Sequence, residues 1–149
     1  MRSLKNEVSD QFLAAIDSLT QELLLYKEET SIWITSAAAK NSAGHLSLHL
    51  IGNLNHFIGH IIGETDYIRD RENEFGGSAV SRHELLAGLT ESKKSVKAAF
   101  DHLPSSKLSE EFPIQVFGFS MTYQYFIIRL LSHFNYHLGQ INYHRRLLD

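Results

Sequence analysis

The amino-acid sequence predicts an all-α protein of 149 residues, folded as a four-helix bundle. Two observations support this fold class. Apolar residues recur at helical spacing in four long stretches, and the alternating pattern of a β-strand is almost absent. Longer connections are expected between the second and third helices and between the third and fourth. No internal repeat, low-complexity tract or composition shift divides the chain, so we expect a single domain over residues 1–149.

The composition excludes several classes of function. Apolar residues make up 43% and charged residues 21% of the chain, as in an ordinary globular protein. The net charge of -3 gives no electrostatic reason to expect nucleic acid or anionic lipid as a partner. No apolar run is long enough to span a membrane and no signal-peptide core is present, so the expected location is cytoplasmic. The chain has no cysteine, which excludes disulfides, thiolate nucleophiles and Cys-type zinc sites, but it has nine histidines.

The first helix is predicted from an apolar stripe between Val8 and Tyr26. The spacing of the stripe alternates between four and three residues, which suits one face of an amphipathic helix in a bundle. Glu28, Glu29 and Thr30 interrupt the stripe. We expect 31–40 to be a connection with a short turn around Trp33.

The second helix is predicted over Ala43 to Ile62, with Asn41 or Ser42 as its N-cap and Gly63 as its C-terminal stop. One side of this helix is apolar. The other side carries histidines and glycines, namely His45, His49, His56, His60, Gly52, Gly59 and Gly63. A glycine inside a helix costs about 1 kcal/mol relative to alanine. We therefore expect that another backbone approaches this side closely or that it leaves room for a ligand.

The third helix is predicted to begin at a capping box formed by Ser81 and Glu84 and to run from Arg82 to about Leu103. The preceding stretch, 64–78, is polar and is expected to be irregular. After Pro104, an extended loop is predicted over 108–119, in which 114–117 pairs at most as a short strand.

The last helix is predicted to begin near Ser120 or Thr122 and to end near Leu147. Within it, His133 and His137 lie about 40° apart around the helix axis, because each residue adds about 100°. Two histidines one turn apart can bind one metal ion, but catalytic zinc usually has three protein ligands and one open position. A third ligand must therefore come from another part of the chain.

Three segments resemble motifs of one protein family. The segment 132–141 resembles the HxxxHxGQ signature of the DinB/YfiT-like family of metal-binding four-helix bundles, 49–54 resembles HLxGNL, and 69–75 resembles RxRxxEF. The two further motifs are typical of an uncharacterised subgroup, and the order and spacing agree over about residues 42–148. The resemblance implies a zinc or nickel ion held by His49, His133 and His137.

Other residues near these motifs have alternative interpretations. His45, one turn before His49, could be a fourth ligand, a neighbour of the ligands or a replacement for His49. Gln140 could orient a ligand histidine or cap a backbone group, and Asn53 could tie the following loop to the second helix. Arg69 and Arg71 could recognise a substrate carboxylate, although ion pairs with the acidic residues of their own loop, Asp70, Glu72 and Glu74, are the favoured interpretation.

The remaining histidines are not expected to contribute to this site. His56 and His60 lie too far along the second helix from His49 to bind the same ion, and we expect them in solvent or at a subunit contact. His83, His102 and His144 are expected to be structural or exposed.

Characterised members of the resembled family include thiol S-transferases, a thiol-dependent isomerase and proposed metal-dependent hydrolases. We therefore expect a metal-dependent transferase or hydrolase acting on a small molecule, with any thiol supplied by a small molecule because the chain has no cysteine. Glu64, Asp66 and Glu74 are candidate general bases by position in the sequence only. The alternative is a non-catalytic binding or stress-related module with a structural or vestigial metal site. A homodimer is expected from the aromatic residues and histidines on outer faces.

Overall fold

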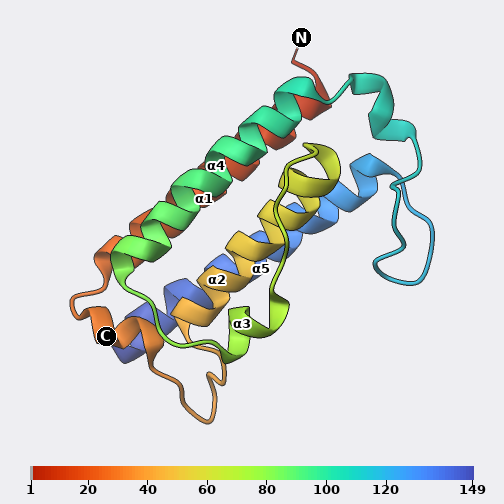
Figure 1. Cartoon of the computed structure of the whole chain (residues 1–149). Helices are drawn as coiled ribbons and strands as arrows, with labels where there is room; N and C mark the ends of the chain where they lie inside the picture. The colour runs from red at the N-terminus through yellow and green to blue at the C-terminus, as the bar shows by residue number, and fades with distance from the viewer. Residues whose placement is uncertain (1) are drawn as a thin grey trace.

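The computed structural model describes residues 2–149 and is all-helical, with no β-strand in that range (Figure 1). The helices are α1 Leu4–Leu25, α2 Ala43–Leu54, its π-helical continuation η2 Asn55–Ile62, α3 Arg71–Gly76, α4 Arg82–His102 and α5 Tyr123–Leu148. Two short 3₁₀ helices, η1 Glu29–Trp33 and η3 Ser105–Ser109, lie in the connections. The prediction of an all-α fold is confirmed.

The four long helices pack against one another along their lengths (Figure 1). Helix α1 contacts α4 and α5, and α2 also contacts α4 and α5. Figure 1 shows that α2 and α4 run in the same direction, joined by a long crossover that contains α3, whereas α1 and α5 run in the opposite direction. This crossover passes beside α2 and brings α3 against it.

The apolar stripe predicted for the first helix forms part of the core. Its members Phe12, Ile16, Leu19 and Leu23 are buried, and Tyr26 directly after the helix is also buried. The helix begins earlier than the stripe, at Leu4, because Ser3 accepts a hydrogen bond from the backbone N–H of Asn6. The periodicity therefore identified the buried face correctly but missed the first polar turn.

The N-terminal caps resolve the alternatives left open by the sequence. Ser42 caps α2 by accepting from the backbone N–H of His45, and Thr122 caps α5 by accepting from that of Tyr125. The capping box of Ser81 and Glu84 is present at the start of α4. Each cap satisfies a backbone donor that has no partner inside the helix.

Two connections differ from the expected structure. The stretch 64–78 is not irregular throughout, because α3 forms over Arg71–Gly76, with Asp70 accepting from the backbone N–H of Asn73. A six-residue helix is too short to show a helical period in the sequence. In the other connection 114–117 forms no strand, and the residues described contain only an isolated bridge between Glu111 and Thr122.

The second helix also changes type along its length. The predicted helix over 43–62 is an α-helix only as far as Leu54 and then continues as η2. The backbone N–H of Gly63 donates to the carbonyl of Ile58 at 2.8 Å, which is the wider hydrogen-bond spacing of a π-helix. A uniform helical rotation therefore does not apply beyond Leu54, although Gly63 does follow the last helical residue as predicted.

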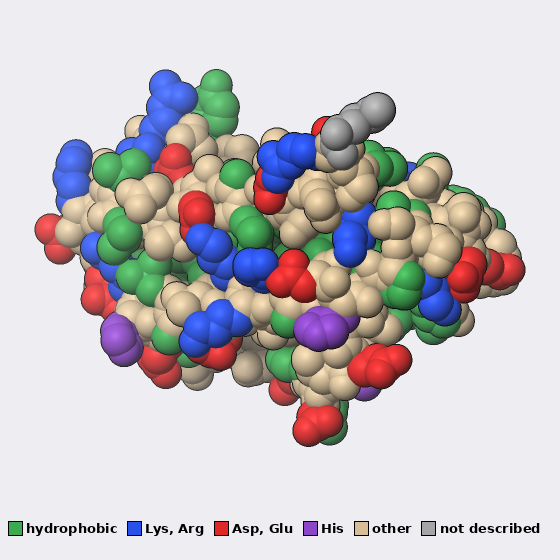
Figure 2. All heavy atoms as spheres, turned by 90° about the horizontal axis from the view of Figure 1, so that it is seen from above, with side chains coloured by type: hydrophobic (Ala, Val, Ile, Leu, Met, Phe, Trp, Pro, Cys, Tyr) green, Lys and Arg blue, Asp and Glu red, His purple; other side chains and the backbone are tan. Residues whose placement is uncertain are grey.

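The surface carries charges of both signs. Figure 2 shows Lys and Arg side chains interspersed with Asp and Glu side chains on one face of the molecule. Among the described residues no helix is both long and apolar enough to pass through a membrane.

Candidate metal centre

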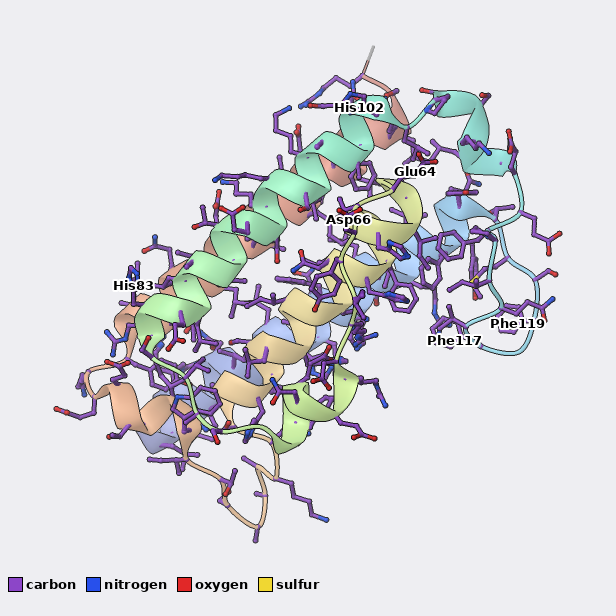
Figure 3. The ribbon with its side chains drawn as sticks, in the orientation of Figure 1. Glu64, Asp66, His83, His102, Phe117 and Phe119 are labelled. Atoms are coloured by element: carbon purple, nitrogen blue, oxygen red, sulfur yellow. The ribbon has the colours of Figure 1, made fainter. Side chains whose placement is uncertain are left out.

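The histidines that were not expected to bind the metal, and two of the candidate general bases, lie away from the predicted three-histidine site. His83 and His102 are exposed near opposite ends of α4, and Glu64 and Asp66 are exposed beside the end of η2 (Figure 3). His56 and His60 stack on each other in η2 with their ring centroids 6.0 Å apart. His144 is buried, where it bonds to the Tyr26 hydroxyl and to the carbonyl of Ile34.

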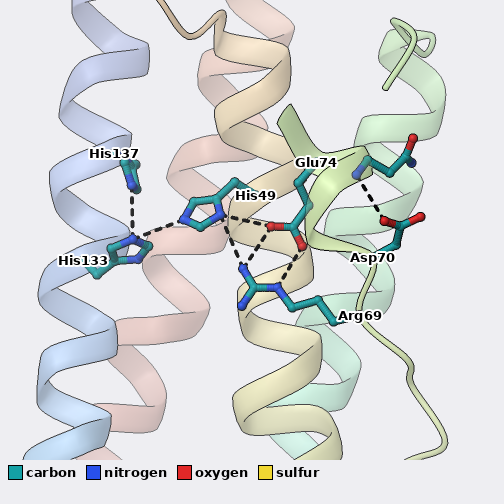
Figure 4. Close-up of polar contacts among 7 residues, drawn as sticks. His49, Arg69, Asp70, Glu74, His133 and His137 are labelled. Carbon is teal, nitrogen blue, oxygen red and sulfur yellow. Dashed lines mark hydrogen bonds and ion pairs between the residues drawn. The ribbon is translucent and has the colours of Figure 1, made fainter. Parts of the chain in front are cut away.

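Three histidines converge between α2 and α5 (Figure 4). His49 comes from α2, and His133 and His137 come from consecutive turns of α5, which runs beside it in the opposite direction. The Nε2 atom of His133 lies 3.2 Å from that of His49 and 3.1 Å from that of His137. The structure thus brings together the three residues that the resemblance implied.

The spacing of these nitrogens fits one small divalent cation. Each of the three histidines offers a ring nitrogen within 4.8 Å of the other two. Nitrogens bound at 2.0–2.1 Å to a tetrahedral zinc ion are separated by about 3.3–3.4 Å. The two Nε2–Nε2 distances of 3.1 and 3.2 Å are only slightly shorter. The donor set therefore fits zinc or a similar borderline divalent metal.

The outer nitrogen of His49 is bound by a buried carboxylate. Nδ1 of His49 lies 3.0 Å from Oε1 of Glu74, which is only 5% exposed. Because the carboxylate accepts, Nδ1 carries the proton and the lone pair of Nε2 is left facing His133. Arg69 donates to both oxygens of Glu74 at 2.9 Å, and this ion pair offsets the cost of burying the carboxylate.

Glycine at position 52 makes this arrangement possible. A Cβ atom on Gly52 would overlap the carboxylate of Glu74. Gly52 lies on α2 one turn after His49, so the helix surface is open at the point where α3 delivers Glu74. The close approach expected on the glycine side of the second helix is therefore made by a side chain and not by a backbone.

The outer nitrogens of the two α5 histidines differ. Nδ1 of His137 lies 2.6 Å from Oε1 of Gln140, so the amide oxygen accepts the Nδ1 proton and leaves Nε2 facing the cluster. This contact is the first of the two interpretations of Gln140. Nδ1 of His133, by contrast, is buried and has no hydrogen-bond partner within residues 2–149.

The surroundings favour neutral imidazoles. Burial, with smaller contributions from the neighbouring His137, His49 and Arg69, lowers the pKa of His133 to about 4. Burial also lowers the pKa of His49, and it outweighs the opposite effect of Glu74. Neutral imidazole is the form that binds a metal, so these two rings are available as ligands at neutral pH.

A cavity of about 700 Å³ opens beside the cluster. His49 and His133 form part of its wall, together with Asn53 and Arg69. The connections contribute Arg71 from α3 and two residues of the loop before α5, Val116 and Phe117. Helices η2 and α5 contribute the other six wall residues: Phe57, Phe126, Arg129, Leu130, Ser132 and Tyr136. This volume lies in the range of small-molecule sites.

The structure also places the remaining candidates. His45 is outside the cluster: its Nδ1 bonds to the hydroxyl of Ser42, and its ring lies edge-on to Trp33. Arg69 is paired with Glu74, as the loop interpretation expected, whereas Arg71 packs over the ring of Phe75. The side chain of Asn53 is buried in the cavity wall, and no hydrogen bond ties it to the loop within the described part of the chain.

The contact of Glu74 with His49 was not identified from the sequence, which offered Glu74 as a candidate general base and as an ion-pair partner of Arg69 and Arg71. The place of Glu74 inside the RxRxxEF segment was the available signal, since Arg69 and Glu74 are five positions apart in the motif. The contact with His49 joins residues 25 positions apart, which no local pattern shows.

One family model, described as "Protein of unknown function (DUF1572)", matches residues 4–149, which is nearly the whole chain. This family is DinB-like, in agreement with the broader resemblance of the histidine motifs. No curated protein matches the chain.

Proposed function

We propose that this chain, which belongs to the DUF1572 family, is a metal-dependent enzyme in which His49, His133 and His137 hold one zinc or nickel ion. The observation that carries the proposal is the orientation of two imidazoles. Glu74 accepts the Nδ1 proton of His49, and Gln140 accepts that of His137. The Nε2 lone pairs of these two histidines therefore converge beside His133. Hydrogen bonds of this kind hold ligand histidines in the correct tautomer at metal sites.

The proposed reaction is the transfer of a small thiol or the hydrolysis of a small molecule. A bound divalent cation supplies a Lewis acid that activates the nucleophile, water or thiol. Three neutral imidazole ligands would leave the bound ion its full double positive charge. The adjacent cavity of about 700 Å³ provides room for a reactant. Because the chain has no cysteine, a thiol would come from outside.

Metal analysis of the purified full-length protein tests the first part of the proposal. We expect about one zinc or nickel ion per chain, and we expect His133→Ala and His137→Ala to remove it. His83→Ala is the matched control, since His83 is exposed on α4 away from the cluster. A wild-type protein that stays empty after metal is added back would contradict the proposal.

Cobalt substitution tests whether the ion is accessible to a reactant. We expect a small thiol to change the visible spectrum of the cobalt protein, and a screen with chlorinated and epoxide electrophiles to detect thiol transfer.

The alternative is a non-catalytic binding or stress-related module with a structural metal. It is favoured by one observation: Glu74, the carboxylate at the cluster, is already engaged by Arg69 and His49. That alternative predicts an unchanged spectrum and a large fall in melting temperature when the metal is removed.

We also infer that the four long helices form a bundle of the DinB/YfiT-like type, and that the protein acts as a cytoplasmic homodimer without a nucleic-acid partner. Support for the dimer comes from large apolar side chains at the surface, among them Phe119 and Tyr143, which are 47% and 62% exposed. Sedimentation at micromolar concentration tests the dimer, and a monomer would contradict it.

A further inference from the structure

Two arginines in the wall of the cavity have no carboxylate partner among the described residues. Arg129 and Arg71 both line the cavity beside the three histidines. Neither forms an ion pair with an Asp or Glu among residues 2–149, whereas Arg69 in the same wall is paired with Glu74. The cavity wall therefore carries two guanidinium groups without an ion-pair partner in the described part of the chain.

Arg129 stands in register with the metal ligands. It precedes His133 by four residues on α5, and His137 follows His133 by four. Residues at this spacing lie on the same face of a helix, about 6 Å apart along its axis. A group bound by Arg129 would therefore lie about one helical turn from the proposed cation.

Aromatic rings hold the two guanidinium groups. The Cζ atom of Arg129 lies 4.5 Å from the ring centroid of Phe117 and 6.0 Å from that of Tyr125. The Cζ atom of Arg71 lies 5.9 Å from the ring centroid of Phe75. Stacking of this kind restrains the plane of a guanidinium group while its N–H donors stay available for a bidentate anion.

Apolar side chains form a large part of the rest of the cavity wall. Phe117 belongs to the loop before α5, as Figure 3 shows, while Phe57, Phe126 and Leu130 come from η2 and α5. Phe126 and Leu130 are buried in the core behind the cavity. A ligand that reaches from Arg129 to the histidines would therefore lie against an apolar surface.

We propose that this cavity binds an organic anion, with its carboxylate or phosphate group held by Arg129 and Arg71 and its apolar body packed on the exposed Phe117 and Val116. The identification of this anion as the substrate rests on the proposed function. The anion site itself depends only on the arginines and the apolar wall.

Isothermal titration calorimetry of the metal-free protein tests the anion site. Without a metal ion, the anion cannot bind by coordinating one. The probes are 3-phenylpropionate, phenyl phosphate, neutral 3-phenylpropionamide and inorganic phosphate. We expect the two aromatic anions to bind, and the amide and inorganic phosphate to bind at least about tenfold more weakly, since each lacks one of the two recognised features. The tighter of the two aromatic anions identifies the head group.

Substitution of the arginine provides the control. Arg129→Gln should lower the affinity for both aromatic anions about tenfold or more without changing the affinity for the amide. Arg146→Gln is the matched variant, because Arg146 is also exposed on α5, stacks 5.2 Å from the ring centroid of Tyr143 and lies outside this cavity. Absence of anion binding, or an equal effect of the two variants, would overturn the proposal.

The two proposals fail separately. If the wild-type protein binds no metal but Arg129→Gln still weakens the aromatic anions, the anion site stands and the metal-dependent function does not. If the protein binds metal but the metal-free form does not distinguish the anions from the amide, the metal centre stands and the anion site is overturned.

Discussion

The carboxylate of Glu74 occupies the space that a side chain at Gly52 would need. Helix α3 therefore docks on α2 through a buried acid that reaches the outer nitrogen of His49. The glycine, the acid and the histidine form one connected arrangement, in which a change in any of the three is transmitted to the candidate metal centre.

Gly52→Ala should destabilise the protein. The new methyl group overlaps Glu74, and the displaced carboxylate loses its contacts with His49 and Arg69. We expect the free energy of unfolding to fall by about 1–3 kcal/mol, the usual cost of overpacking. Urea denaturation measures it.

Gly139→Ala is the matched control for this substitution. Gly139 lies inside α5, and apart from its chain neighbours and its own helix backbone no described atom lies within 4 Å of the added Cβ position. Alanine there should raise the free energy of unfolding by about 0.5–1 kcal/mol through helix propensity alone. If Gly52→Ala instead raised the free energy of unfolding, the close approach of Glu74 to Gly52 would be contradicted.

Glu74→Gln should weaken metal binding. The amide oxygen can still accept the Nδ1 proton of His49, but the negative charge is lost and the half-buried Arg69 is left unpaired. We expect a loss of about 10–100-fold in zinc affinity, the usual effect of removing a partner of a ligand histidine. Competition with a chromophoric chelator measures this affinity, and Glu72→Gln, at an exposed position of the same short helix, should leave it unchanged.

Gln140→Ala should also weaken metal binding, with little effect on folding. Gln140 is exposed, and its amide oxygen holds the Nδ1 proton of His137. Without this contact His137 can adopt the other tautomer or turn away, so zinc affinity should fall by about tenfold. Gln124→Ala, another exposed position on α5, is the control for loss of a glutamine from this helix. Equal affinities in the two variants would show that Gln140 does not orient His137.

The metal-free protein should lose stability as the pH falls from 6.5 towards 4. The pKa of His133 is lowered from its ordinary value of 6.5 to about 4 in the folded protein. Between these values the unfolded chain binds the proton and the folded chain does not, so acid favours unfolding. His133→Gln has no titrating ring at this position and should show a shallower decline in denaturation experiments at pH 7, 6 and 5. Parallel declines would contradict the lowered pKa.

The helices and their caps were largely predictable because they depend on local patterns. The stripe from Phe12 to Leu23 and the capping box of Ser81 and Glu84 both appear in the structure as expected. The π-helical segment after Leu54 and the short helix α3 were not predictable in this way. Both segments pack against elements that come from another part of the chain, η2 against α4 and α3 against α2, and such contacts leave no local pattern in the sequence.

The candidate site was predictable only in part, and for a similar reason. The i,i+4 spacing of His133 and His137 is visible in the sequence, and the resemblance added His49. The sequence left open what each outer nitrogen contacts. The structure shows Glu74 at His49, Gln140 at His137, and at His133 a buried Nδ1 that has no partner among residues 2–149. The sequence also left open whether His45 belongs to the set, because its contact with Trp33 depends on the path of the preceding connection.

His49 and His133 are 84 positions apart in the chain, yet their Nε2 atoms lie 3.2 Å from each other. During folding, this pair can form only after α5 has docked onto α2, and a nascent chain that ends before α5 has one of the three donors. Uptake of the cation would therefore be coupled to the completion of the whole domain, and free metal in excess of its dissociation constant would shift the folding equilibrium towards the native state.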